Sequence, residues 1–280
     1  FTQALTGGAQ TLTYDSTHVY VSVGAVTGTW TGTAGNGLWN TGTNWLAGSA
    51  PGTNVNSRGL DVALVGTNGT PTTITLAATK TQLRDLTFEA ATGTGYTLVG
   101  ADATKSLWLF GSAGATLAVR QGSHTVALPV VIESDVTANV TNATDSLRVS
   151  GVVSGTGGIT KTGLGVLTLS GNNTNVGGAT LSAGVLEVGH NNAFGTGTLV
   201  LNGGRLRGDD ATTSRTISNA VTLGGDVTLG DTTKTAPLVL AGAVTLTGNR
   251  TVTLDSGVTV SSAIGDGGSG YGLTKDGTAQ

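Results

Sequence analysis

An adjacent pair of carboxylates is the first feature of this 280-residue chain that could do chemistry. Asp209 and Asp210 follow the segment Arg205-Leu206-Arg207-Gly208, and no other two acidic residues are adjacent in the sequence. Hydrolysis of a glycosidic bond needs two carboxyl groups that flank the bond. With two arginines next to it, the pair is explained more simply as a charged surface corner. We therefore predict no catalytic residue and no enzyme.

Metal and cofactor sites are not predicted either. His18, His124 and His190 share no ligand spacing, and the chain has no Cys, so we expect three solvent-facing histidines on strands or corners. The segment Gly267-Gly268-Ser269-Gly270-Tyr271-Gly272 is similar to a calcium-binding nonapeptide. However, Gly272 stands where that motif needs its Asp ligand, which disfavours calcium.

Tryptophans are the remaining candidates for binding. Trp30, Trp39 and Trp45 lie within sixteen residues, spaced by Gly and Asn, and Trp108 follows later. Exposed rings of this kind could stack on the faces of sugars. Alternatively, the first three rings close one end of a stacked fold and hide its core from water, as the terminal units of repeat proteins do.

The composition favours ordered β-structure with many turns. Gly accounts for 47 residues without a Gly-X-Y period, and only 10% of residues are charged, which excludes collagen and disfavours disorder. A net charge of −3 and the lack of a basic run disfavour a nucleic-acid partner. The longest apolar stretch, Val126 to Ile132, is too short to span a bilayer. The chain lacks Met and begins at Phe1, so we expect an exported protein whose signal peptide has been removed.

The elements that must position these residues are short strands. Segments 11–14 and 19–23 alternate with period 2 around a turn and predict a hairpin. From Leu60 onward, further alternating segments are separated by Gly, Asn and Asp, with no helical stretch. Val166-Leu167-Thr168-Leu169 is followed nineteen residues later by Val185-Leu186-Glu187-Val188. This pattern predicts a stack of coils, in which a coil length near 19 residues gives about fourteen coils and a rod about 70 Å long.

One phrase gives the chain a family resemblance. The matching segments are Gly158-Ile159-Thr160-Lys161-Thr162-Gly163, Leu167-Thr168-Leu169-Ser170-Gly171-Asn172-Asn173, Gly177-Gly178-Ala179-Thr180 and Ala183-Gly184-Val185-Leu186. In these residues the chain resembles the autotransporter-associated β-strand repeat. The segments around Trp30, Trp39 and Trp45, closed by Pro51-Gly52, are similar to the element that often precedes such repeats. The resemblance implies an all-β, right-handed parallel β-helix displayed outside a bacterial cell, where such proteins serve as stalks, adhesins or surface-layer components.

These observations divide the chain into three parts. They are 1–28, N-terminal strands that could link subunits; 29–58, a Trp-rich cap; and 59–280, a β-solenoid with the repeat phrase at 157–188 and a truncated copy at 271–280.

Two functions follow from this division. The first is an extracellular or cell-surface scaffold that associates with itself head to tail into a fibre, because exposed strand edges accept further strands. The predicted subunit contacts are Leu12, Tyr14, Val19, Tyr20, Val21 and Val23 at one end and Tyr271 and Leu273 at the other. The alternative is an adhesin-type stalk that binds cell-surface glycans through Trp30, Trp39, Trp45 and Trp108.

Overall fold

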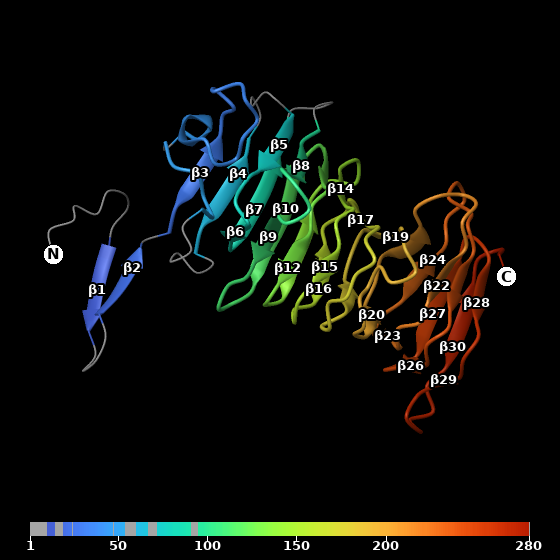
Figure 1. Cartoon of the computed structure of the whole chain (residues 1–280). Coiled ribbons are helices and arrows are strands. Elements are labelled where there is room, and N and C mark those ends of the chain that lie inside the picture. The colour runs from blue at the N-terminus through green and yellow to red at the C-terminus, as the bar shows by residue number, and fades with distance from the viewer. Residues whose placement is uncertain are drawn as a thin grey trace, which may run out of the picture.

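The computed structural model describes residues 10–14, 19–23, 25–46, 48–53, 60–66, 72–90 and 95–279. These residues form thirty short strands and one turn of 3-10 helix, η1 (Gly42–Asn44). All strands except the first two pair in parallel and stack into a β-solenoid of about 9 turns (Figure 1). The predicted all-β parallel β-helix is therefore confirmed.

Two long sheets form the first two faces of the solenoid. Sheet 1 consists of β3 (Thr27–Trp30), β4 (Val62–Val65), β7 (Asp85–Glu89), β10 (Ala115–Gln121), β13 (Val136–Val140), β16 (Ile159–Thr162), β18 (Ala179–Leu181), β20 (Leu199–Leu201), β23 (Val221–Leu223), β26 (Val244–Leu246) and β29 (Ile264–Gly265). Sheet 2 consists of β5 (Thr73–Leu76), β8 (Thr97–Gly100), β11 (Ser123–Val126), β14 (Ser146–Val149), β17 (Val166–Leu169), β19 (Val185–Val188), β21 (Arg205–Gly208), β24 (Val227–Leu229), β27 (Arg250–Leu254) and β30 (Leu273–Asp276).

The third face is made of two shorter sheets with a gap between them. The first contains β6 (Lys80–Leu83), β9 (Ser106–Leu109), β12 (Val130–Ile132) and β15 (Val153–Ser154), and the second contains β22 (Arg215–Ile217), β25 (Leu238–Leu240) and β28 (Val258–Val260). The two coils between β15 and β22 therefore have strands on sheets 1 and 2 only. Figure 1 shows the coils following one another along a single axis.

Side-chain amides add to the backbone hydrogen bonds between coils in the gap, such as the one from the Thr174 N–H to the Val153 carbonyl. Asn173 is buried, accepts a hydrogen bond from the Val153 N–H at 2.7 Å and donates one to the Ala193 carbonyl at 2.7 Å. Since Val153 and Ala193 belong to the coils on either side, Asn173 connects three successive coils. Asn219 acts similarly and donates to the carbonyls of Gly195 and Gly197. Buried backbone groups need such partners when no strand is present to supply them.

Coil length differs from the prediction. Val166 does pair with Val185, as the nineteen-residue offset predicted, but this is a short coil. On sheet 1 the pairing partner lies 23 residues on from Val136 and 20 residues on from Ile159, because the corners vary in length. The prediction of about fourteen coils was wrong. With about 9 turns and ~4.8 Å per turn, the stack is roughly 40 Å long.

The core is one continuous column of apolar side chains inside the coils. On sheet 2, Leu147, Leu167, Leu186 and Leu206 pair in sequence on four successive strands, and each is at most 1% exposed. Burying a side chain of this size contributes about 1.5–3 kcal/mol. The column extends from the tryptophans at one end to Val252 at the other.

The Trp-rich segment is the first coil of the stack. β3 pairs with β4 on sheet 1, Leu38 bridges Thr75 on sheet 2, and the Gly52 carbonyl accepts a hydrogen bond from the Gln82 N–H on the third face. The predicted boundary between residues 28 and 29 falls inside β3, and the predicted boundary after residue 58 lies outside the described residues. The cap is thus an irregular coil that contributes backbone to every face.

The two ends differ in structure. At the N-terminal end, β1 (Gln10–Tyr14) and β2 (Val19–Val23) form the predicted antiparallel hairpin, which makes a sheet of its own (Figure 1). At the other end, the restarted phrase forms β30 on sheet 2, whereas the same phrase in the full copy forms β16 on sheet 1. The two copies therefore occupy different faces.

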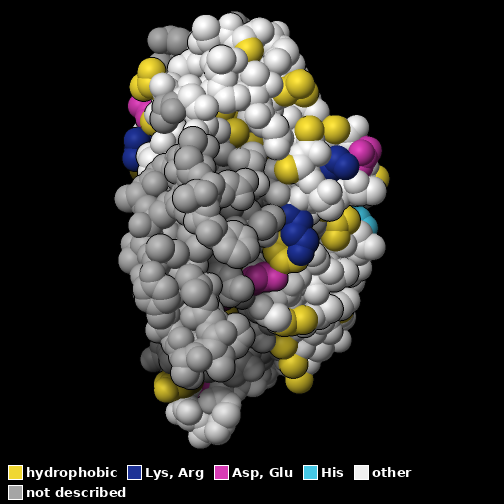
Figure 2. Space-filling view, turned by 60° about the vertical axis from the view of Figure 1, so that its left-hand side comes forward, with side chains coloured by type: hydrophobic (Ala, Val, Ile, Leu, Met, Phe, Trp, Pro, Cys, Tyr) yellow, Lys and Arg dark blue, Asp and Glu magenta, His cyan; other side chains and the backbone are white. Residues whose placement is uncertain are grey.

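The surface carries few charges over its first half. On the side shown in Figure 2, charged side chains are sparse and hydrophobic ones lie in scattered small patches. No helix among the described residues has the length and apolar character needed to cross a membrane.

Candidate functional site

Most of the charged side chains with multiple contacts gather on the outer side of sheet 2. Arg148, Thr168, Glu187 and Arg207 stand on four successive strands and pair with one another in register. Inward-facing leucines alternate with them, so the period-2 pattern that fills the core also places these polar residues in one outward row. Corner residues after β21, β24 and β27 complete the network.

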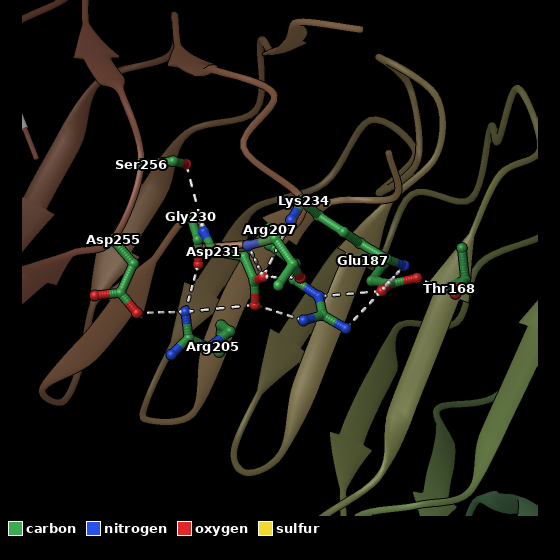
Figure 3. A network of polar contacts seen from close by, with 10 residues as sticks. Thr168, Glu187, Arg205, Arg207, Gly230, Asp231, Lys234, Asp255 and Ser256 are labelled. Carbon is green, nitrogen blue, oxygen red and sulfur yellow. Dashed lines mark hydrogen bonds and ion pairs between the residues drawn. The ribbon is translucent and has the colours of Figure 1, made fainter. Parts of the chain in front are cut away.

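Glu187 lies at the centre of this network and is 3% exposed. Its Oε1 accepts hydrogen bonds from Arg207 Nε at 3.0 Å and from Lys234 Nζ. Its Oε2 accepts the hydroxyl of Thr168 at 2.7 Å (Figure 3). Both carboxylate oxygens are thus occupied, and two cations compensate the charge that burial would otherwise make costly.

Asp231 is the second carboxylate of the network. It accepts hydrogen bonds from Arg207 Nη1, from the hydroxyl and N–H of Thr233 and from the N–H of Lys234. Burial alone raises the pKa of Asp231, but the hydrogen bonds from Thr233, Lys234 and Arg207 outweigh it and hold the pKa well below its usual range. Asp231 is therefore ionised at neutral pH.

Arg205 extends the network toward the C-terminus, and Asp209 is the centre of a second group of ion pairs on the same side of the solenoid. Arg205 contacts Asp255 at 2.6 Å and the Gly230 carbonyl at 2.7 Å (Figure 3). Asp209 pairs with Arg148 at 3.3 Å and with Arg215 at 2.7 Å. Asp210 also contacts Arg215, and hydrogen bonds from Thr213 and Thr212 lower its pKa to about 2.

This chemistry is that of a structural network. Five cations (Arg148, Arg205, Arg207, Arg215 and Lys234) face five carboxylates (Glu187, Asp209, Asp210, Asp231 and Asp255). A general acid needs a carboxyl whose pKa is raised toward the working pH, whereas the shifts of Asp210 and Asp231 are downward. Within the described residues, no three His, Asp or Glu side chains are grouped so as to hold a metal ion.

The sequence identified part of this site. Arg205, Arg207, Asp209 and Asp210 were predicted as a charged corner; all four are paired charges, but Arg205 and Arg207 lie on β21, and only Asp209 and Asp210 lie at the corner that follows it. The roles of Arg148, Glu187 and Lys234 were missed because they lie up to 61 residues from their partners. Aligning the sequences of successive coils would have placed Glu187 opposite Arg207 and so predicted their contact.

The cap tryptophans are core residues. Trp30, Trp39 and Trp45 are at most 2% exposed, and their rings meet edge to face, with centroids 5.3 Å apart for Trp30 and Trp45 and 4.6 Å apart for Trp39 and Trp45. Their faces are covered by protein and cannot stack on a sugar. Of the four predicted glycan-stacking residues, Trp108 alone has an accessible ring, half-buried on β9.

His124 corrects a further expectation, because it is buried rather than solvent-facing. Its ring stacks between Phe88, at 4.7 Å between centroids, and Tyr96, at 5.8 Å. Nδ1 accepts a hydrogen bond from the Tyr96 N–H, and Nε2 lies 2.9 Å from the Gln121 carbonyl, which accepts its proton. Burial lowers the pKa of His124, so the imidazole is a neutral core residue. His190 lies at a corner as expected, and His18 lies outside the described residues.

The predicted subunit contacts are only partly described. Leu12, Tyr14, Val19, Tyr20, Val21 and Val23 lie in the hairpin strands, whose side chains the structure does not describe. Tyr271 and Leu273 lie in the last coil and are 40% and 41% exposed. Contact between these two sets stays a prediction.

Fold and site together define a β-solenoid whose polar residues are paired with one another. Residues 159–188 of this solenoid match the Passenger-associated-transport-repeat family, which confirms the resemblance to autotransporter passenger repeats. A stretch of 92 residues is 40% identical to the Adhesin BmaC autotransporter of Brucella suis biovar 1 (strain 1330). That stretch covers 31% of this chain and 3% of the adhesin. No solved structure matches the chain.

Proposed function

We propose that this chain is a spacer segment of an exported passenger protein, displayed at a bacterial cell surface, whose function is mechanical and not enzymatic. The observation that carries the proposal is the parallel stack of about 9 turns with a passenger-transport repeat inside it. A stack of this kind gains length by adding coils, each of which contacts its neighbours. The paired carboxylates of sheet 2 support the absence of catalysis.

Self-association of such segments is the finer part of the proposal. Strands at the ends of a solenoid have unpaired backbone groups that accept further strands. We predict that the purified 280-residue chain forms filaments in electron micrographs, and that deletion of residues 1–24 leaves single rods roughly 40 Å long. Filaments that persist after this deletion, or a parent protein that stays monomeric at high concentration, would contradict head-to-tail pairing through the hairpin.

Glycan binding is the second candidate, and one observation favours it. Trp108 faces outward on the third face, where Lys80 Nζ lies 3.8 Å from its ring centroid and Ser106 accepts a hydrogen bond from its indole N–H at 2.8 Å. A half-exposed ring beside an ammonium group and a hydroxyl suits a sugar that carries hydroxyl or carboxylate groups. The similarity to a protein named as an adhesin agrees with this candidate.

Fluorescence can test the glycan site directly. A panel of neutral and acidic polysaccharides is expected to change the tryptophan emission of the parent protein and to leave that of Trp108→Leu unchanged, because the three other rings are buried. Lys80→Met should weaken the response to acidic members of the panel. A response that survives in Trp108→Leu, or no response from the parent to any member, would rule out this site.

A further inference from the structure

Three ion pairs on sheet 2 connect coils that are not neighbours. Arg148 on β14 pairs with Asp209 after β21, so the contact passes over two coils. Glu187 on β19 pairs with Lys234 after β24, and Arg205 on β21 pairs with Asp255 after β27, so each of these contacts passes over one coil. In a solenoid, the ordinary expectation is that each coil contacts only the next.

These three contacts overlap along the axis. The first spans residues 148–209, the second 187–234 and the third 205–255. Arg207 joins the second span to the third, because it pairs with Glu187 at 2.8 Å and with Asp231, and Asp231 in turn lies 3.7 Å from Arg205 (Figure 3). The result is a continuous series of ion pairs from Glu187 on β19 to Asp255 after β27. The first contact, between Arg148 and Asp209, belongs to a second group with Arg215 and Asp210.

The first of these contacts passes over the part of the stack where the third face has no strands. Between Ser154 at the end of β15 and Arg215 at the start of β22, two coils have no strand on the third face. Arg148 belongs to the coil that contains β15, and Asp209 belongs to the coil that contains β22. Their contact therefore passes over both of the coils that lack the third strand.

Burial separates the group around Glu187 from the charges elsewhere in the described part of the chain, whereas Arg148 in the first contact is 45% exposed. The side chains of Glu187 and Asp231 are 4% and 11% exposed, and that of Arg207 is 16% exposed. In contrast, Arg120 and Glu89, which connect neighbouring coils, are 62% and 36% exposed. Partly buried pairs are screened less by salt and contribute more than exposed ones.

We propose that these two groups of ion pairs act together as a splint. The Arg148–Asp209 pair connects the coils on both sides of the gap in the third face, and the group around Glu187 ties the second coil of the gap to the coils that follow, so that β14 to β27 unfold together with the rest of the stack. Without the splint, the two coils of the gap become a boundary at which the solenoid divides. The C-terminal coils beyond the gap then unfold first, while the N-terminal coils with their complete third face persist.

Two optical probes distinguish these outcomes, because all four tryptophans lie at or before residue 108. Tryptophan fluorescence therefore reports the N-terminal coils, whereas far-ultraviolet circular dichroism reports every strand. In urea, the parent protein should show one midpoint by both probes. Lys234→Met, which leaves Arg207 and Thr168 on Glu187, should lower the midpoint by circular dichroism and leave the fluorescence midpoint in place.

Hydrogen exchange locates the effect, and further variants control it. Amides of β22 to β28 should lose about tenfold in protection in Lys234→Met, whereas those of β7 to β12 should be unchanged. Arg148→Met removes the contact that passes over both coils of the gap and should act in the same direction, and it serves if Lys234→Met does not fold.

Arg120→Met removes an exposed pair between neighbouring coils and should leave the two midpoints together. Three results would overturn the proposal. The first is that both network variants keep coincident midpoints and unchanged hydrogen exchange. The others are that the parent protein already has separate midpoints, or that Arg120→Met separates them as the network variants do.

Discussion

Replacing Trp39 by alanine is expected to lower the free energy of unfolding by about 3–5 kcal/mol, the range for truncation of a buried large aromatic side chain. The Trp39 ring has no exposed surface and packs against Trp45. Its indole N–H donates to the Pro51 carbonyl at 2.8 Å, which would lose this donor. Since the cap covers the first complete coil, a cavity here exposes the end of the core column as well.

Urea unfolding followed by circular dichroism measures this loss. Trp39→Phe keeps an aromatic ring but not the hydrogen bond, so it should cost less than the alanine variant. Leu46→Ala is the matched control, because Leu46 belongs to the same coil and is 77% exposed, and its effect should stay within about 0.5 kcal/mol. If Trp39→Ala were as stable as Leu46→Ala, the first coil would not act as a cap.

The fold could be predicted from the sequence because its signals are local. Alternation of apolar and polar residues marks each strand, and Gly, Asn and Asp mark the corners. The pairing of Val166 with Val185 follows from the repeat itself. Coil number was wrong because one spacing was applied to the whole chain, whereas the first coils are longer: Thr27 pairs with Val62, 35 residues later.

The charged network could not be predicted because its members meet only through stacking. Glu187 and Lys234 are 47 residues apart, and their contact requires the lengths of two coils and the course of a corner. His124 was assigned to the surface because the histidines share no ligand spacing and the chain has no Cys, yet Phe88 and Tyr96 from the preceding coil enclose it. The gap in the third face also could not be predicted, because the hydrogen bonds of Asn173 and Asn219 join coils that are distant in sequence.

Lys161 shows how the repeat phrase works physically. It lies on β16 with no exposed surface, and its Nζ donates to the carbonyls of Thr162 at 2.7 Å, Gly163 at 2.9 Å and Ala183 at 3.2 Å. The ion pairs among the described residues do not include it, so three corner carbonyls hold this ammonium group. Burial lowers the pKa of Lys161 to about 8.

This shifted pKa predicts that the protein becomes more stable as the pH rises from 8 toward 10. In this range the unfolded chain, whose lysines have pKa values near ~10.4, binds more protons than the folded chain, so raising the pH favours folding. The gain attributable to Lys161 should approach about 2 kcal/mol by pH 10. Well below pH 8 Lys161 is protonated in both states, and its contribution no longer changes with pH.

A pair of variants from the two copies of the phrase isolates this effect. Lys161→Met removes the titrating group and should flatten the rise in unfolding free energy between pH 8 and pH 10. Lys275→Met is the matched control, because Lys275 occupies the same position in the restarted phrase but is exposed on β30, with its Nζ donating to the Gly277 carbonyl at 2.8 Å. Its profile should keep the rise of the parent protein. If the unfolding free energies of the parent and of Lys161→Met changed with pH in parallel, the prediction would be wrong. The three corner carbonyls would then stabilise the ammonium group of Lys161 as well as water does.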